Sequence, residues 1–216
     1  MKEKKTGYFL SLRWLYPAHC ALCDGILERK EEGLCEACRK RVRIAECPFE
    51  GGYAAFPYTG IYRDAVRRFK YSGRAEYAAW FAEAVLEAGR GLADTWQPEA
   101  LVPVPIHRNR FRERGYNQAE ELARELGKRL HVPCEAEMVT RCRDTLPQNG
   151  LDPAGRKENL QGAFAVRDKA AVPARVVLVD DIRTTGSTLR ELEKVLRKSG
   201  AEEVRAMCIC LAGNGI

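Results

Sequence analysis

Residues 176–189 constrain the fold of this chain more than any other segment. They begin with four apolar residues (176–179), which have the length and residue type of a buried parallel strand. Two acids, Asp180 and Asp181, follow directly, and a hydroxyl- and glycine-rich turn comes next. A helix that ends at Gly200 is predicted after the turn, with an apolar face of Leu189, Leu192, Val195 and Leu196. The segment therefore predicts a strand–loop–helix unit of a parallel α/β sheet.

The turn, Thr184-Thr185-Gly186-Ser187-Thr188, has the composition of an anion-binding loop. Backbone N–H groups at a helix start have no intrahelical partner, Gly186 lets the backbone approach a ligand closely, and the hydroxyls add donors. The carboxylates of Asp180 and Asp181 suit the vicinal hydroxyls of a ribose. Ligands of open parallel sheets lie outside the carboxyl ends of the strands. We therefore expect a phosphorylated sugar here; the alternative is an ordinary strand–turn–helix corner with a capped helix.

The same stretch resembles the phosphoribosyl-pyrophosphate (PRPP) loop of type I phosphoribosyltransferases, in which four apolar residues and two acids precede Thr-Thr/Ser-Gly-x-Thr. One position departs from that pattern, because Arg183 stands where an apolar or aromatic residue is more usual. The resemblance implies that Asp180 and Asp181 are the catalytic residues, which hold the ribose hydroxyls, and that residues 184–188 hold the 5′-phosphate.

Four cysteines near the start of the chain, Cys20-x-x-Cys23 and Cys35-x-x-Cys38, have the spacing of zinc ligands. Each pair forms a tight knuckle that presents two sulfurs to one ion, and two knuckles complete a tetrahedron. Because four protein ligands leave no open position, this zinc would be structural. Two disulfides or an iron–sulfur cluster are the alternatives. Cys47 stands alone, and we expect a buried or spare thiol there.

The bulk composition indicates a soluble protein of a reducing compartment. The chain has 216 residues, enough for one α/β domain with a small appendage, and 45% of them are hydrophobic and 31% charged. No apolar run reaches the roughly 18–20 residues that span a bilayer, and no signal peptide is expected. Nine cysteines without a secretory signal favour the cytoplasm. The net charge of +6 does not by itself imply nucleic acid.

Basic residues are densest at 107–115, directly after a predicted first core strand. A basic loop at the carboxyl end of that strand can face the pyrophosphate of PRPP, because the planar fork of arginine meets phosphate oxygens in pairs. Arg108 and Arg112 are the expected contacts. Arg156, on a Gly-, Pro- and Asn-rich loop at 143–160 that we predict to be a lid, is the third. The alternative is a solvated, basic helix start.

Several motifs together resemble the competence protein F (ComF) family, whose members join an amino-terminal zinc module to a type I phosphoribosyltransferase domain. The matching pieces span nearly the whole chain in the family's order: the four paired cysteines, 69–73, 102–105, 114–119, Gln148, Arg156 with Asn159, and 179–188. Many relatives carry further paired cysteines near position 47, whereas Cys47 has no such partner here. A further zinc knuckle near position 47 is therefore not expected.

The resemblance implies a zinc-binding module at 1–50 and a phosphoribosyltransferase-like domain at 51–216. Within that domain it implies a hood at about 53–90 and, at about 100–216, a parallel five-stranded core with flanking helices. It also implies PRPP bound with Mg²⁺, most of whose ligands come from PRPP and water. In some bacteria the family is linked with natural transformation and the uptake of single-stranded DNA.

Two functions are compatible with these motifs. The first is a phosphoribosyltransferase that moves phosphoribose from PRPP to a nitrogen acceptor by direct displacement on C1 and releases pyrophosphate. The second is a non-catalytic competence protein that binds PRPP, or that grips single-stranded DNA and a DNA-uptake helicase. In the second case, basic and aromatic side chains would contact phosphates and stack a base: Arg108, Arg110, Arg112, Arg114, Phe111 and Tyr116. Neither the acceptor nor the oligomeric state is predicted.

Overall fold

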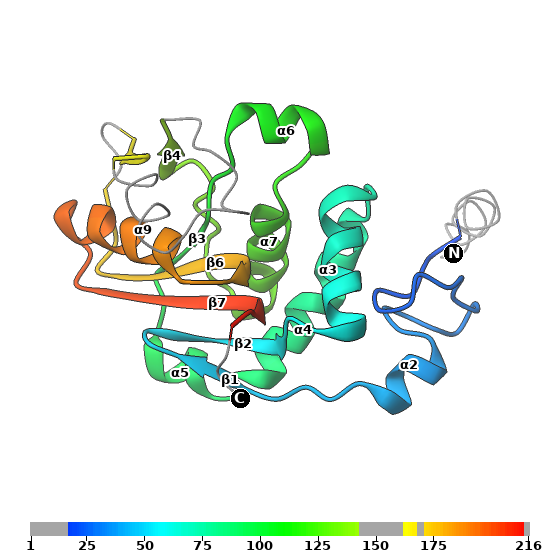
Figure 1. Ribbon diagram of the computed structural model, residues 1–216. Coiled ribbons are helices and arrows are strands. Elements are labelled where there is room, and N and C mark those ends of the chain that lie inside the picture. The colour runs from blue at the N-terminus through cyan, green and yellow to red at the C-terminus, as the bar shows by residue number, and fades with distance from the viewer. Residues whose placement is uncertain (1–16, 143–161, 168–170, 214–216) are drawn as a thin grey trace, which may run out of the picture.

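The computed structural model describes residues 17–142, 162–167 and 171–213. Its main sheet has five strands in the order β1–β2–β7–β6–β3 (Figure 1). Their bounds are β1 (Cys47–Phe49), β2 (Gly52–Pro57), β3 (Ala100–Pro103), β6 (Arg175–Arg183) and β7 (Glu203–Leu211). The apolar run at 176–179 lies inside β6, as the sequence predicts.

Four of the five strands are parallel, and the edge strand β1 differs from the expected parallel arrangement. β2, β7, β6 and β3 pair in parallel, while β1 pairs antiparallel with β2. Only Glu50 and Gly51 join β1 to β2, and Gly51 has a φ of +80°. Because parallel neighbours need a long crossover, so short a connection permits only a hairpin.

Residues 53–57, part of the segment at about 53–90 that the resemblance assigns to a hood, form most of β2 inside the main sheet. β2 pairs in parallel with β7, and Tyr53, Ala54, Ala55 and Phe56 are each at most 1% exposed. A strand buried on both faces is typical of a sheet interior rather than of a separate flap. The proposed boundary between residues 50 and 51, and a hood built from the remaining residues up to about 90, stay predictions.

Helices cover both faces of the main sheet (Figure 1). One face carries α3 (Gly60–Tyr71), α4 (Ala78–Ala88) and α7 (Gln118–Leu130). The other carries α9 (Ser187–Lys198) and a small antiparallel sheet of β4 (Val139–Arg141) and β5 (Phe164–Val166). The remaining short helices are α2 (Glu36–Arg41), η1 (Ala75–Tyr77), α5 (Leu92–Trp96) and α6 (Arg108–Arg114).

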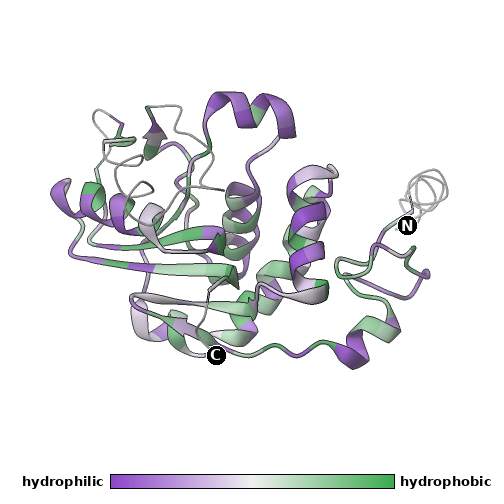
Figure 2. Ribbon diagram, viewed as in Figure 1, coloured by the Kyte–Doolittle hydropathy of each residue, from purple (hydrophilic) through white to green (hydrophobic). Residues whose placement is uncertain are grey.

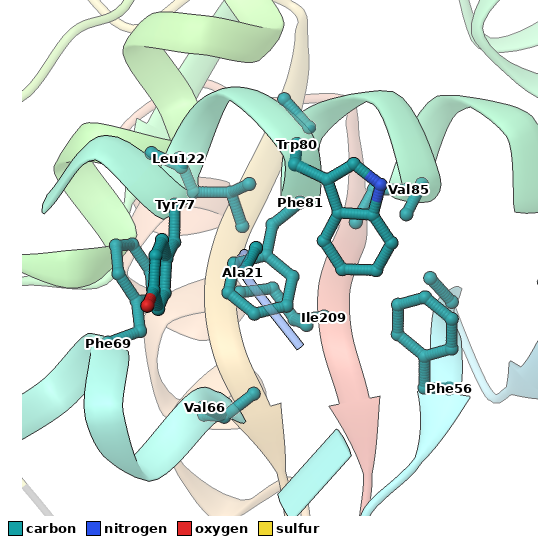
Figure 3. Close-up of a cluster of buried hydrophobic side chains, with 14 of the residues drawn as sticks. Ala21, Phe56, Val66, Phe69, Tyr77, Trp80, Phe81, Val85, Leu122 and Ile209 are labelled. Atoms are coloured by element: carbon teal, nitrogen blue, oxygen red, sulfur yellow. The ribbon is translucent and has the colours of Figure 1, made fainter. Parts of the chain in front are cut away.

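The alternation of side chains along β6 divides the core into two layers. Val177 and Val179 pack with the cluster under α4 and α7, while Val176 and Leu178 pack with the cluster under α9. Aromatic side chains of α3 and α4 fill the first layer, where Phe69, Phe81 and Trp80 gather above β6 and β7 (Figure 3). Burying a side chain of this size contributes about 1.5–3 kcal/mol, so this layer fixes α3 and α4 on the sheet.

The Gly-, Asp- and Pro-rich composition of residues 89–99 predicts a linker, but the segment includes α5. Trp96 explains the difference, because its ring lies 5.6 Å from that of Tyr53 and so draws the segment onto the sheet. The predicted lid, with Gln148, Arg156 and Asn159, lies outside the described residues, so the structure does not test the proposed contact of Arg156. Among the residues described, no helix combines the length and apolarity needed to cross a membrane.

Candidate functional site

A cavity of about 780 Å³ opens at the carboxyl ends of β3 and β6. Helices α3, α6 and α7 and the loop between β6 and α9 form its walls. Its polar lining includes Lys70, Arg110, Arg114, Gln118, Asp180, Asp181, Thr184, Ser187 and Thr188. The cavity therefore lies where open parallel sheets bind their ligands, and the two predicted acids and most of the predicted loop meet in it.

The two acids at the end of β6 have different surroundings. Asp181 is buried, and its Oδ2 lies 2.9 Å from Nζ of Lys70 on α3. Asp180 is half-buried, and its Oδ1 accepts the backbone N–H of Asp181 at 2.8 Å. Burial, and next the neighbouring charge of Asp181, raise the pKa of Asp180 above that of an ordinary aspartate. Burial works to lower the pKa of Lys70, but the attraction of Asp181 outweighs it, and the pKa is raised.

This asymmetry suits the recognition of a diol. Lys70 remains a cation that holds the Asp181 carboxylate in place. Asp180 keeps its proton to a higher pH than an ordinary aspartate, so it can donate as well as accept a hydrogen bond. Two adjacent hydroxyls, each of which is both donor and acceptor, would find matching partners in this pair.

The loop after β6 presents a helix start to the cavity. α9 begins at Ser187, and Gly186, in its N-cap position, has a left-handed φ of +73°. Thr184, Gly186, Ser187 and Thr188 line the cavity, as predicted, but Thr185 is not part of the lining. The Oγ1 atom of Thr185 instead lies 2.9 Å from Oγ of Ser187 and accepts the backbone N–H of Ser187 at 3.4 Å. Thr185 therefore stabilises the loop conformation. The start of α9 thus has backbone donors and positive helix-dipole charge for an anion.

The basic stretch before α7 forms a helix, α6, and presents a different pair of arginines from the one predicted. Arg110 and Arg114 line the cavity, whereas Arg108 and Arg112 are exposed and outside the lining. Successive residues of a helix are about 100° apart, so residues two positions apart point to nearly opposite sides. Figure 2 shows α6 as a mainly hydrophilic helix, so hydropathy alone does not tell its two sides apart.

Several contacts fasten α3 to the start of α7 beside the acids. Arg114 donates to Oε1 of Gln118 at 2.9 Å and to the hydroxyl of Tyr71 at 3.2 Å. Gln118 is 1% exposed and donates to the backbone carbonyl of Lys70 at 3.4 Å. The hydroxyl of Tyr116 donates to the carbonyl of Phe69. These bonds hold the end of α3 in the position that brings Lys70 to Asp181.

Lys70 and Gln118 line the cavity but are not among the predicted site residues, although both lie in segments that match the resembled family, 69–73 and 114–119. Lys70 shares the polar side of α3 with Arg63 and Arg67, and all three line the cavity. That polar stripe is a visible signal of a charged helix face, but sequence spacing does not tell which cavity the face borders. Gln118 gives a weaker signal, because a glutamine at a helix start is ordinary until its burial is known.

The four paired cysteines come together as a second site. Their sulfur atoms all lie within 4.8 Å of one another, and Sγ of Cys23 is 3.8 Å from Sγ of Cys35. α2 starts directly after Cys35 and carries Cys38. Four thiol ligands at these distances fit one tetrahedral Zn²⁺ with no position left for a substrate, so the residues suit a structural zinc. Cys47 lies outside this cluster, and its thiol donates to the carbonyl of Ala45.

The zinc-binding module packs directly against the helices of the main domain. Asp24, which directly follows Cys23, has a left-handed φ of +64°. Its carboxylate accepts from the hydroxyl of Tyr77 and lies 3.1 Å from Arg74. Arg68 of α3 donates to the carbonyl of Leu22. The module therefore shares polar contacts, as well as the buried layer of Figure 3, with α3 and the start of α4.

Comparisons with known proteins agree with this two-part description. Residues 11–49 match the family described as double zinc ribbon domain, and residues 112–215 match the phosphoribosyl transferase domain. Among solved structures, a purine phosphoribosyltransferase from Pyrococcus horikoshii is 17% identical over 61% of this chain and 74% of its own, with a TM-score of 0.39. The two family matches thus coincide with the cysteine cluster and with most of the cavity.

Relatives of similar length share most of the chain. "Competence protein F" of Haemophilus influenzae is 34% identical, over 86% of this chain and 93% of its own length. "DNA utilization protein YhgH" of Salmonella typhimurium is 30% identical, over 90% of this chain and 97% of its own length. This degree of identity over nearly the full length shows common descent. The chain therefore belongs to the competence protein F family, whose zinc-binding module precedes a phosphoribosyltransferase-like domain.

Proposed function

We propose that this protein binds PRPP together with Mg²⁺ in the large cavity and transfers its phosphoribosyl group to a nitrogen acceptor. The observation that carries the proposal is the meeting of Asp180, Asp181 and the start of α9 in one cavity, with Lys70 2.9 Å from Asp181. The acid pair suits the two ribose hydroxyls, and the helix start suits the 5′-phosphate, so together they match a ribose 5-phosphate unit.

The charge of the cavity supports an anionic ligand of this size. Among the described residues, seven cationic side chains line it, against three acidic ones. The cations are Arg63, Arg67, Lys70, Arg110, Arg114, Arg141 and Arg183. A concave wall with this excess of one sign raises the local concentration of ligands of the opposite sign. PRPP, which carries a phosphate and a pyrophosphate, matches both the charge and its spread across the cavity.

The chemical step is a displacement at C1 of the ribose. The bond from C1 to the pyrophosphate oxygen breaks, its electron pair leaves with pyrophosphate, and a bond forms from C1 to the acceptor nitrogen, which loses a proton to solvent. Negative charge grows on the leaving group as positive charge grows on the ribose. Arg110 and Arg114 are placed to stabilise the former, and the Asp181 carboxylate orients the ribose. Fixed charges of this kind lower the barrier without a nucleophilic side chain.

Magnesium would require few protein ligands in this arrangement. Asp181 is already engaged by Lys70, and Asp180 is half-buried, so the pair can supply at most a small share of an octahedral shell. The bound ion would neutralise pyrophosphate charge, and the chain's own part is to position the ribose and the 5′-phosphate. The oxygen atoms of PRPP and water fit the remaining positions.

The test is an assay of pyrophosphate release from PRPP and Mg²⁺ by the zinc-loaded, full-length protein, with a panel of nitrogen bases as acceptors. We expect release with one acceptor class and a fall of about a hundredfold or more in Asp181→Asn. Arg108→Ala, on the outer side of α6, is the matched control and should retain release. PRPP binding without release from any acceptor would favour a sensor over an enzyme.

A second candidate function is the binding of single-stranded DNA, alone or with a DNA-uptake helicase. The relatives' names refer to competence and to DNA utilization. The structure adds that Arg108, Arg112 and the 48% exposed Phe111 lie on α6 outside the cavity lining, where a strand could reach them. An affinity for single-stranded DNA that falls steeply with salt, and falls further in Phe111→Ala, would support this function. A salt-independent affinity would contradict it.

A further inference from the structure

A second, smaller cavity lies behind the loop between β6 and α9. Its volume is about 290 Å³, and the β1–β2 hairpin, the end of β6, α9 and the start of β7 form its walls. It shares Arg183, Gly186 and Leu189 with the large cavity, so the two lie on either side of the same loop. Four guanidinium groups and three carboxylates line it.

Two of these four arginines already have carboxylate partners. Arg197 lies 2.9 Å from Glu193, and Arg205 lies 2.6 Å from Glu203. For Arg183 and Arg190, no carboxylate of the described residues comes within 4.0 Å. The charge of Glu50, the remaining acid of this wall, acts on Arg183 only from a greater distance.

The two unpaired guanidinium groups converge on one backbone position. A Cβ atom built on Gly186 would lie 3.1 Å from Nε of Arg183 and 3.1 Å from Nη1 of Arg190. Burial, and next the like charge of Arg190, lower the pKa of Arg183, so the two cations repel one another. An anion bound between them would turn that repulsion into two attractions.

Other contacts hold both side chains in place. The guanidinium of Arg183 lies over the ring of Phe49, 4.5 Å from its centroid. Arg190 donates from Nη2 to the backbone carbonyl of Thr185 at 2.8 Å. Each contact uses only part of the guanidinium, so N–H donors remain on both, and side chains already ordered lose less entropy when a ligand binds.

We propose that Arg183 and Arg190 form a second anion site, on the side of the loop that faces the smaller cavity, and that this site binds a phosphate group. The planar fork of arginine is suited to phosphate oxygens, and two forks facing one point can hold a single phosphate from two sides. The ligand is a small phosphate anion, either inorganic phosphate or the phosphate of a mononucleotide. Arg183 borders both cavities, whereas Arg190 lines only the smaller one, so Arg190 is the residue that separates this site from PRPP binding.

The first test locates the anion in crystals of the full-length protein. Crystals are soaked in selenate, a phosphate-like anion that is visible by anomalous scattering. We expect a peak between the guanidinium groups of Arg183 and Arg190. A peak confined to the large cavity, or no peak, would overturn the proposal.

The second test measures binding of inorganic phosphate by calorimetry, with PRPP and Mg²⁺ present to occupy the large cavity. We expect wild type to bind phosphate and Arg190→Gln to bind it about tenfold or more weakly, because a charged hydrogen-bond partner is lost. Arg197→Gln, in the same cavity but paired with Glu193, is the matched control and should stay within about twofold of wild type. Equal affinity in wild type and Arg190→Gln would overturn the proposal.

A folding control and a titration with AMP accompany these two tests. Zinc content and melting temperature equal to wild type show that each variant is folded. AMP in place of phosphate distinguishes the sources of the ligand: tighter binding of AMP identifies a mononucleotide, and equal or weaker binding identifies free phosphate. If PRPP itself does not bind, the proposed transferase function fails, while the selenate peak still decides whether this second site exists.

Discussion

The cysteine cluster and the large cavity differ in how the chain builds them. All four cysteines lie within one short segment, and their sulfur atoms form a closed set within 4.8 Å. The cavity instead takes residues from α3, α6, α7 and the loop after β6, which are far apart in the sequence. The cluster can satisfy one ion completely, whereas the cavity keeps donors and acceptors open for a ligand.

The closed site therefore contributes to folding, and the open site is available for ligand binding and chemistry. A closed tetrahedral set contributes its binding free energy to folding. An open set holds charges that the protein itself does not neutralise, and such a site is stable only if other contacts position it. Here α3 links the two regions, because Arg68 contacts the zinc-binding module and Lys70 contacts Asp181.

The largest effect is expected at the closed site. Cys38→Ser should abolish zinc binding and unfold the module, because metal binding supplies roughly 10–16 kcal/mol to such small segments. Zinc content and resistance to proteolysis measure this loss. Cys47→Ser, which changes a cysteine outside the cluster, is the control and should keep its zinc. Equal zinc content in the two variants would show that the cluster does not bind zinc as a four-cysteine set.

At the open site, the largest effect is expected from Asp181→Asn. The change leaves Lys70, whose side chain is 18% exposed, without its carboxylate, and should lower the free energy of unfolding by about 2–4 kcal/mol. The double variant Lys70→Met/Asp181→Asn should recover much of this stability but not PRPP binding. Chemical denaturation and calorimetry measure the two quantities. If stability fails to recover in the double variant, the ion pair is not the cause of the loss.

The pH dependence of stability should reveal the raised pKa of Asp180. The pKa of Asp180 is raised in the folded protein, so the folded state holds a proton that the unfolded chain releases near the ordinary value of 3.8. The free energy of unfolding should therefore fall as pH rises above 3.8 and through the raised pKa of Asp180. Asp180→Asn removes this slope, as urea denaturation at a series of pH values would show. An unchanged slope would refute the raised pKa.

The smallest effect is expected from the two sides of α6. Arg110→Ala should weaken PRPP binding about tenfold, because Arg110 lines the cavity, while Arg108→Ala should change it less than about twofold. Calorimetry on both variants provides the comparison. The reverse order would mean that the helix presents its other side to the ligand.

Features whose residues lie close together in the sequence could be predicted from it. The run from the buried strand to the start of α9 and the two cysteine pairs are such features, and the structure brings the residues of each together. Cys208 and Cys210 are another case: their spacing puts them on one face of an apparent strand at 204–211, which predicts a place in the core, and both are buried in β7. In these cases the local pattern and the physical role coincide.

Features that depend on packing between distant elements could not be predicted. The ion pair of Lys70 with Asp181 depends on how α3 lies on the sheet, which the aromatic layer of Phe69 and Phe81 decides. The choice of Arg110 over Arg108 depends on the rotation of α6, a helix polar on nearly all sides. Likewise, β2 belongs to the main sheet because of its pairing with β7, which no local motif records.

The most direct test of the whole account is a calorimetric titration of the zinc-loaded protein with PRPP, with and without Mg²⁺. We expect saturable binding to wild type that is strengthened by Mg²⁺ and is lost in Asp181→Asn. An absence of binding at millimolar PRPP, or equal binding by wild type and Asp181→Asn, would contradict it.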